Sequence, residues 1–490
     1  MLQVVVSSVV LLLLYSFVVR ALGVAAFGVW ALVLATVSAG RLGDLGMARA
    51  VVRFVAQRLG RGDEAEAALI VETAAVTLGG VGAVLLPILY VPCAWSLRAV
   101  VSGPSQPDAI RLLPYALASV WLLAIGGAFQ SALDGCQRID IRNAIGIGAN
   151  ILHLALVLVL VPHYGLDGLA YAQILQCSAL VGASWIALRR QLPALSIVPR
   201  AWRRLLAREM LRYSVNLQIG SAAQLLFEPV TKVLMTKFGG LEAVGYFEMA
   251  NRLLLQVRRL PLSAAEVLVP VVAHLETKPG NRVGSICREA FGLLTYCSVP
   301  LFGIIVALAP VVSAIWLGRR EPVFVVFVTL LAAAWFVNTL ASVAYFVNLG
   351  SGRLFWNTAT HLVMGAVNIA LGLGLGRMFG AGGVALAFAC AILCGSAVLV
   401  LSYYREQKAS LIRFCTRSEG ALVALAMCGI GAAWLACLTL KSGTPVLVTG
   451  AIAAVVFCAA VAIPAWRHPV RHQLATHVGH WVGGAGRVNA

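Results

Sequence analysis

Charged residues are scarce in this sequence. Asp, Glu, Lys and Arg make up 11% of its 490 residues, while hydrophobic residues make up 61%, and the mean hydropathy is +0.91. Soluble domains carry about 25% charged residues, so the composition excludes a soluble globular protein. Apolar runs of this length indicate a polytopic membrane protein.

Motifs for ATP use and for covalent catalysis are also lacking. No G-x-x-x-x-G-K-[ST] phosphate loop occurs, which excludes an ATP-driven pump of that class. The glycines of Gly372–Gly376 lie within an apolar run and indicate close helix packing, not a dinucleotide site. The predicted outer loops are too short for a polysaccharide polymerase or ligase. We therefore expect a protein that is not an enzyme and that has no cofactor.

Neither the cysteines nor the histidines form a convincing metal site. The eleven cysteines are scattered, nearly all of them in apolar runs, as is typical of packing residues and not of disulfides or zinc ligands. His468, His472, His477 and His480 follow the last apolar run, with no acid or cysteine nearby to complete a ligand set. We expect no metal and interpret this end of the chain as an interfacial basic tail.

Windows of about 20 apolar residues predict about fourteen transmembrane helices. Residues 1–19 are interpreted as the first of them, and not as a cleaved signal, because no basic segment precedes the apolar run. The eighth is the weakest, since Arg252, Arg258 and Arg259 interrupt it. The predicted spans are 1–19, 27–47, 67–90, 112–132, 143–162, 166–188, 213–237, 241–262, 288–315, 323–347, 354–377, 380–403, 419–439 and 444–465.

The surplus of basic residues predicts the orientation. Lys and Arg total 37 against 19 acids, a net charge of +18. With the N-terminus inside, about 26 basic residues fall in or beside cytoplasmic loops and about 8 on the outer side, in agreement with the positive-inside rule. We predict that both termini are cytoplasmic and that the chain has no nucleic-acid partner, because no basic stretch is interleaved with aromatics on a soluble domain.

The two halves of the sequence resemble each other. A shift of 217 residues (240 minus 23) superposes Gly23 on Gly240 and Gly28 on Gly245, and it also superposes Arg41 on Arg258. A shift of 215 residues (379 minus 164) superposes residues 164–170 on 379–385. Two matches at nearly one shift indicate a duplicated six-helix unit. An even number of spans in each copy predicts two lobes related by an axis along the membrane normal.

This duplication predicts the domain organisation. The loop between the copies is rich in arginine, which is typical of an amphipathic segment lying on anionic lipid; a site for a cytoplasmic partner is the alternative. The predicted parts are an N-terminal lobe at 1–190, a cytoplasmic amphipathic linker at 191–212, a C-terminal lobe at 213–404, two additional helices at 405–466 and a basic tail at 467–490.

Several charged residues lie inside the predicted spans, where charges usually face a protein interior or a water-filled cavity. Glu228 precedes Lys232 by four residues and Glu248 precedes Arg252 by four, the favoured order for a pair on one helical face. Such pairs either neutralise themselves during membrane insertion or take part in transport, and both alternatives stay open. Basic side chains attract phosphate oxygens and carboxylates take up protons or a cation, so the transport alternative assigns substrate binding to Arg20, Arg41, Lys232, Arg252 and Arg258 and coupling to Asp44, Glu228 and Glu248. The other alternative places Arg20 and Arg258 at helix ends, from which they snorkel to the interface.

The order of several motifs resembles a known family. They are Arg20–Gly23 with Phe27–Trp30, Leu42–Gly46, Val244–Arg252 followed by Pro270, and the Gly-x-x-Gly-x-Ala turns at 165–170 and 380–385. From residue 1 to about residue 465 the chain resembles the polysaccharide flippases of the MOP exporter superfamily.

This resemblance implies a fold and a function. The implied fold has two six-helix lobes around a central cavity, with two further helices. The implied function is alternating-access transfer of an undecaprenyl-diphosphate-linked oligosaccharide across the bacterial inner membrane, together with polysaccharide polymerase and export machinery. The related lipid II flippases have a cationic cavity, and the matching positions are Arg20, Arg41 and Arg252. A lipid II flippase, a cation-coupled multidrug exporter of the same superfamily and a non-transporting scaffold are the alternatives.

Overall fold

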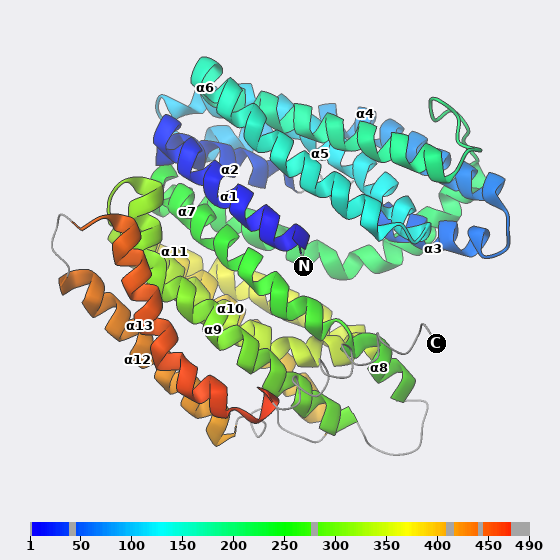
Figure 1. Cartoon of the computed structure of the whole chain (residues 1–490). Helices are drawn as coiled ribbons and strands as arrows, with labels where there is room; N and C mark the ends of the chain where they lie inside the picture. Colours follow the sequence, from blue (N-terminus) through cyan, green and yellow to red (C-terminus); the bar gives the residue numbers. More distant parts are fainter. Residues whose placement is uncertain (1, 39–45, 276–282, 408–415, 440–443, 472–490) are drawn as a thin grey trace. The chain divides into compact units, whose positions relative to one another are not determined.

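The computed structural model describes residues 2–38, 46–275, 283–407, 416–439 and 444–471 (Figure 1). Every regular element in these residues is a helix. The chain divides into two compact units, Met1–Glu248 and Met249–Ala490, with the boundary inside one long helix. The predicted domain boundaries at 190, 212, 404 and 466 stay predictions.

Within its described residues, the first unit contains helices α1 to α6 and most of α7. Its core joins α3, α4 and α5 with the segment that follows α6. The helices are α1 (Leu2–Leu22), α2 (Val24–Ser38), α3 (Met47–Leu59), α4 (Glu64–Val100), α5 (Ser105–Gly135), α6 (Ile139–Gln191) and α7 (Arg204–Ala265), the last of which continues into the second unit.

In the second unit α12 and α13 pack against α9, around a cluster that includes Val299, Leu422 and Phe457. In Figure 1 the red and orange α13 and α12 lie side by side next to α9. The helices are α8 (Leu268–Leu275), α9 (Val283–Leu317), α10 (Pro322–Gly350), α11 (Leu354–Gln407), α12 (Arg417–Thr439) and α13 (Val446–Arg467).

Three helices are about twice the length of a membrane span. At 1.5 Å per residue, the 53 residues of α6 would extend to about 80 Å, against about 30 Å of hydrocarbon. Each long helix breaks at a glycine with positive φ, namely Gly165 in α6, Gly240 in α7 and Gly380 in α11. Each therefore consists of two successive spans, joined where the hydropathy pattern predicts a junction.

These helices make an all-α membrane protein. Eight of the described helices are long and apolar enough to cross a membrane, and α1 and α2, which are bent by 119° at their junction, pass the same test together. When α6, α7 and α11 are divided at their glycines, the described helices other than α3 and α8 supply fourteen segments. This confirms the predicted fold class, an all-α membrane protein, and the number of about fourteen spans stays a prediction.

The second predicted span, 27–47, is only partly described. The described part of helix α2 reaches Ser38, residues 39–45 lie outside the described residues, and a separate helix, α3, begins after Gly46, whose φ is 70°. Three arginines in α3 made this segment resemble a loop. The segment nevertheless has a buried face at helical spacing. The residues of this face are Met47, Ala50, Val51, Phe54 and Val55.

The backbone supports the duplication. Gly165 has φ 56° and ψ −131°, and its equivalent Gly380 has φ 58° and ψ −137°. Three residues later, a Cβ on Gly168 would collide with the carbonyl of Leu160, and a Cβ on Gly383 would collide with that of Leu375. Both copies thus make the same glycine turn and the same close approach of their two helices.

The duplication also shows in a contact between α2 and α7. A Cβ on Gly28 would collide with the carbonyl of Leu241, and a Cβ on Gly245 would lie 2.6 Å from the carbonyl of Val24. The shift of 217 residues exchanges Val24 with Leu241 and Gly28 with Gly245. The contact is therefore self-complementary, as at a two-fold axis, and both glycines allow the two backbones to touch.

Candidate substrate-binding site

A buried ion pair lies on α7. The Nζ atom of Lys232 is 2.6 Å from a carboxylate oxygen of Glu248, and the two side chains are 2% and 6% exposed. Lys232 and Glu248 lie on opposite sides of the break at Gly240, so this pair joins two successive spans. The sequence spacing predicted pairs within each span; the structure gives Lys232 a carboxylate from the following span. Buried charges need such compensation.

A second cationic side chain, Arg258, is surrounded by neutral groups in the second unit. Its Nη2 donates to Oδ1 of Asn338 at 2.6 Å, and its guanidinium lies 4.5 Å from the ring centroid of Trp335. Its Nε is buried without a hydrogen-bond partner in the described residues, none of which places a carboxylate within ion-pair distance of it. Arg258 is therefore a cation held by an amide and an aromatic face.

The neighbours of Arg258 fix its position. Asn338 donates to the hydroxyl of Ser396 at 3.0 Å, and Trp335 donates its indole N–H to Asn251 at 3.1 Å. All four side chains are buried. Helices α7, α10 and α11 thus converge on one polar cluster, which orients both the amide and the ring against the guanidinium.

The other predicted site residues are not brought into this cluster. Arg20 is exposed in the last turn of α1, the helix-end position of the snorkelling alternative. Glu228 and Arg252 are half-buried on α7. Arg41 and Asp44 lie outside the described residues.

In the first unit a half-buried, neutral polar cluster joins α1 to α6, and the sequence pattern did not single it out as a site. Asn150 of α6 donates to the hydroxyl of Ser7 on α1 at 2.9 Å and accepts from Gln176 at 3.5 Å. Gln176 in turn accepts from Gln173 at 3.3 Å. Amide side chains inside predicted spans are the sequence feature that could have indicated this cluster. They indicate a functional site less strongly than charged side chains do, because amides also join packed helices through ordinary hydrogen bonds.

A polar pocket of about 290 Å³ opens in the first unit at the junction of α5 and α6. The ion pair of Arg142 with Asp134, at 2.6 Å, lies on its wall. Hydroxyl and amide groups on the same wall can bind a polar ligand. The lining residues are Ala48, Gly127, Gln130, Ser131, Asp134, Arg142 and Gly146.

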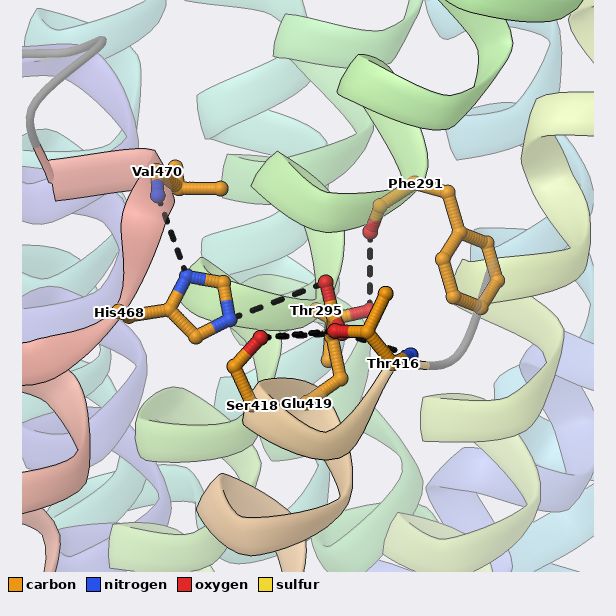
Figure 2. A network of polar contacts seen from close by, with 7 residues as sticks. All are labelled: Phe291, Thr295, Thr416, Ser418, Glu419, His468 and Val470. Carbon is orange, nitrogen blue, oxygen red and sulfur yellow. Dashed lines mark hydrogen bonds and ion pairs between the residues drawn. The ribbon is translucent and has the colours of Figure 1, made fainter. Parts of the chain in front are cut away.

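A polar network joins the start of α12 to the end of α13 (Figure 2). Glu419 accepts from the backbone N–H of Thr416 at 2.8 Å and from the Thr416 hydroxyl, a capping interaction for the first turn of α12. The Nε2 atom of His468 lies 3.8 Å from the same carboxylate.

The sequence did not indicate the burial of His468. Its side chain is completely buried and lies near the ring of Tyr296, at 5.2 Å between centroids, whereas the rest of the predicted basic tail from residue 472 lies outside the described residues. Burial lowers the pKa of His468, and the nearby Glu419 opposes that shift. In the described residues no cluster of three or more His, Cys, Asp or Glu side chains suited to a metal occurs.

Comparison with known proteins agrees with this architecture. The sequence model of the family described as "Polysaccharide biosynthesis protein" matches residues 1–276, more than half of the chain. No curated protein matches the sequence.

Solved structures with the same fold are transporters. An inward-facing multidrug resistance MATE family transporter of the MOP superfamily has a TM-score of 0.72 at 14% identity, over 83% of this chain and 96% of its own. The lipid II flippase MurJ, in an inward closed conformation, has a TM-score of 0.69 at 14% identity, over 94% and 97%. A MOP superfamily transporter from Pyrococcus furiosus has a TM-score of 0.58 at 12% identity, over 84% and 96%.

The helical architecture of this chain thus has counterparts in solved transporters, and the family match covers more than half of the sequence. The protein is a multi-pass membrane protein with a MOP-superfamily transporter fold, and it belongs to the polysaccharide biosynthesis protein family.

Proposed function

We propose that this protein is a flippase that moves an undecaprenyl-diphosphate-linked oligosaccharide repeat unit from the inner to the outer leaflet of the bacterial inner membrane by alternating access. The product would serve exopolysaccharide, O-antigen or capsule synthesis. In this proposal both termini are cytoplasmic, and a polysaccharide polymerase and export machinery receive the flipped unit.

The observation that carries the proposal is the environment of Arg258. A guanidinium in a membrane lobe that lies against an amide and a ring, with no carboxylate within ion-pair distance in the described residues, keeps donors available for an anion. Arginine binds phosphate oxygens through its planar fork of N–H groups. A diphosphate cannot cross hydrocarbon unaided, because an unpaired charge in that medium is very costly. Basic groups along the path would replace its hydration shell while the polyprenyl chain remains in lipid.

Lys232 would contribute in a different manner. Its ammonium is neutralised by Glu248, so it becomes available to phosphate only when the carboxylate takes up a proton or is displaced. This gives Glu248 a coupling role, with Glu228 and Asp44 as the other candidates. Arg20, Arg41 and Arg252 remain proposed members of the cationic path.

The test is a complementation experiment with a matched control. In a deletion strain, Arg258→Gln is expected to reduce surface polysaccharide at least tenfold and to cause lipid-linked repeat units to accumulate, because the neutral amide cannot compensate the diphosphate charge. Arg259→Gln removes the same charge from the next position, where the side chain is exposed and donates to Gln256 at 3.2 Å. It is expected to complement fully at equal expression.

The results separate the alternatives. Full complementation by Arg258→Gln would contradict the assigned role of the guanidinium. A deletion strain without accumulated lipid-linked units would favour a scaffold. A deletion that changes drug resistance without a glycan defect would favour a multidrug exporter, and one that blocks peptidoglycan precursors would favour a lipid II flippase.

A further inference from the structure

The segment between α6 and α7 is folded back onto α4 by one buried carboxylate. Glu72, which is 4% exposed, accepts from the backbone N–H of Ser196 at 2.9 Å and also from its hydroxyl. Its second oxygen accepts from the backbone N–H groups of Arg200 at 3.2 Å and Ala201 at 2.9 Å. Four donors on one carboxylate fix a non-helical stretch of chain that would otherwise have many conformations.

Hydrogen bonds from two indole N–H groups also hold this segment in place. Trp202 donates to the hydroxyl of Thr77 on α4 at 3.1 Å, and Trp185 of α6 donates to the carbonyl of Ile197 at 3.0 Å. On the inner side of this segment and of the first turns of α7, four apolar residues belong to the core of the first unit. They are Leu192, Leu195, Leu206 and Met210.

The outer side of the same segment is both apolar and basic. Ile197 is 75% exposed and Leu205 is 81% exposed, and Val198 and Trp202 are also exposed. Six exposed arginines are interleaved with them or precede them, and in the described part of the chain none of the six has a carboxylate within ion-pair distance. These arginines are Arg189, Arg190, Arg200, Arg203, Arg204 and Arg208.

We propose that residues 195–208 form a binding surface for anionic phospholipid headgroups, held in shape by Glu72 as a positioning residue. The segment begins where one span ends and precedes another, so it lies at the depth of the headgroups. Exposed aliphatic side chains and an indole enter the boundary between headgroups and acyl chains, as in interfacial segments. Unpaired arginines in the same surface match the phosphates of an anionic leaflet.

The charge pattern favours lipid over a protein partner. A basic cluster beside a membrane span is typical of segments that bind anionic lipid, and here six exposed arginines share a short stretch with four exposed apolar residues. The surface does not depend on the transport cycle, so its lipid preference can be measured on the protein at rest.

The experiment uses the full-length protein in nanodiscs. The fluorescence of Trp202, obtained as the difference between the wild type and Trp202→Phe, is measured with one quarter of the lipid replaced by brominated phosphatidylglycerol or by brominated phosphatidylcholine. We expect brominated phosphatidylglycerol to quench Trp202 at least twofold more strongly. Replacing Arg200, Arg203, Arg204 and Arg208 together by glutamine is expected to abolish this preference.

A matched variant replaces four exposed arginines elsewhere, Arg98, Arg259, Arg377 and Arg417, by glutamine and should retain the preference. Equal quenching by both lipids in the wild type would overturn the proposal, and so would an unchanged preference in the first variant. Absence of quenching by either lipid would place the segment in water and favour a cytoplasmic protein partner.

The positioning role has its own readout. Glu72→Gln removes the charge that the four donors share, so hydrogen exchange at the amides of Ser196, Arg200 and Ala201 is expected to accelerate at least tenfold while the rest of α4 keeps its protection. Unchanged exchange at these amides would refute the role of Glu72. The arginine variant tests the lipid surface whatever the outcome for Glu72.

Discussion

Lys232 and Glu248 show how strongly a charge depends on its partner inside a membrane protein. The two side chains are 2% and 6% exposed and lie 2.6 Å apart. In such a place neither ion has water to solvate it, and each is tolerated because the other is there.

Removal of one partner is therefore expected to destabilise the protein. Lys232→Met removes the ammonium that the buried Glu248 carboxylate contacts, and breaking a buried ion pair costs about 3–5 kcal/mol. The double variant Lys232→Met, Glu248→Met removes both charges of the pair and should recover most of this loss. Reversible unfolding in detergent and the midpoint of thermal unfolding measure both effects.

Lys237→Met provides the control, since this exposed lysine lies one helical turn beyond Lys232. It should leave the midpoint nearly unchanged. If the single and double variants were equally destabilised, the pair would have no net coupling and packing alone would explain the loss.

At the scale of elements, the absence of a side chain at Gly28 allows helices α2 and α7 to approach closely. A Cβ on Gly28 has no room against the carbonyl of Leu241, so Gly28→Ala must separate two backbones. We expect a loss of about 1–3 kcal/mol, the usual cost of overpacking, and a lower yield of folded protein. Gly79→Ala is the matched control, because a Cβ on Gly79 in α4 meets nothing within 4 Å and alanine favours helix.

The junction of α12 and α13 is expected to weaken in acid. Burial lowers the pKa of His468 in the folded protein below its ordinary value of 6.5, so the unfolded chain takes up the proton more readily. Stability from this group is complete above about pH 6.5 and is lost as the pH falls through the folded pKa.

Thermal unfolding between pH 7.5 and pH 5 measures this effect. The wild type should lose stability over this range, and His468→Phe should lose less, because it removes the titrating group while retaining a ring against Tyr296. An identical pH profile for both proteins would show that other groups cause the acid sensitivity.

At the scale of the whole molecule, the even number of predicted spans places both ends of the chain on the same side, and the positive-inside rule predicts that this side is the cytoplasm. A green fluorescent protein fused after Ala490 should fluoresce, and alkaline phosphatase fused there should be inactive. Phosphatase inserted at Gly103, between α4 and α5, should be active, since three spans precede that loop. Phosphatase inserted near Ser196 should again be inactive, and activity at that position would reverse the predicted orientation.

Much of the architecture could be predicted from the sequence because its physical cause is local. Apolar runs must be helical in a bilayer, where each backbone polar group needs a partner within its own segment. Gly23 recurs as Gly240 and Gly165 recurs as Gly380, at shifts of 217 (240 minus 23) and 215 (380 minus 165), and all four adopt a positive φ between two successive helical segments. The sequence analysis did not predict helix α3, because its arginines interrupt the apolar pattern and its amphipathic face is short.

The tertiary structure decided the partners of the charged side chains. Spacing along one helix placed Glu228 beside Lys232, but the buried carboxylate that contacts Lys232 belongs to Glu248 of the next span. Burial of His468 and the four hydrogen bonds of Glu72 depend equally on residues far away in the chain. The sequence by itself determined the helices and their duplication, through hydrophobicity and backbone conformation. Only folding decided which polar groups meet, because such contacts depend on distances between elements that the order of residues does not record.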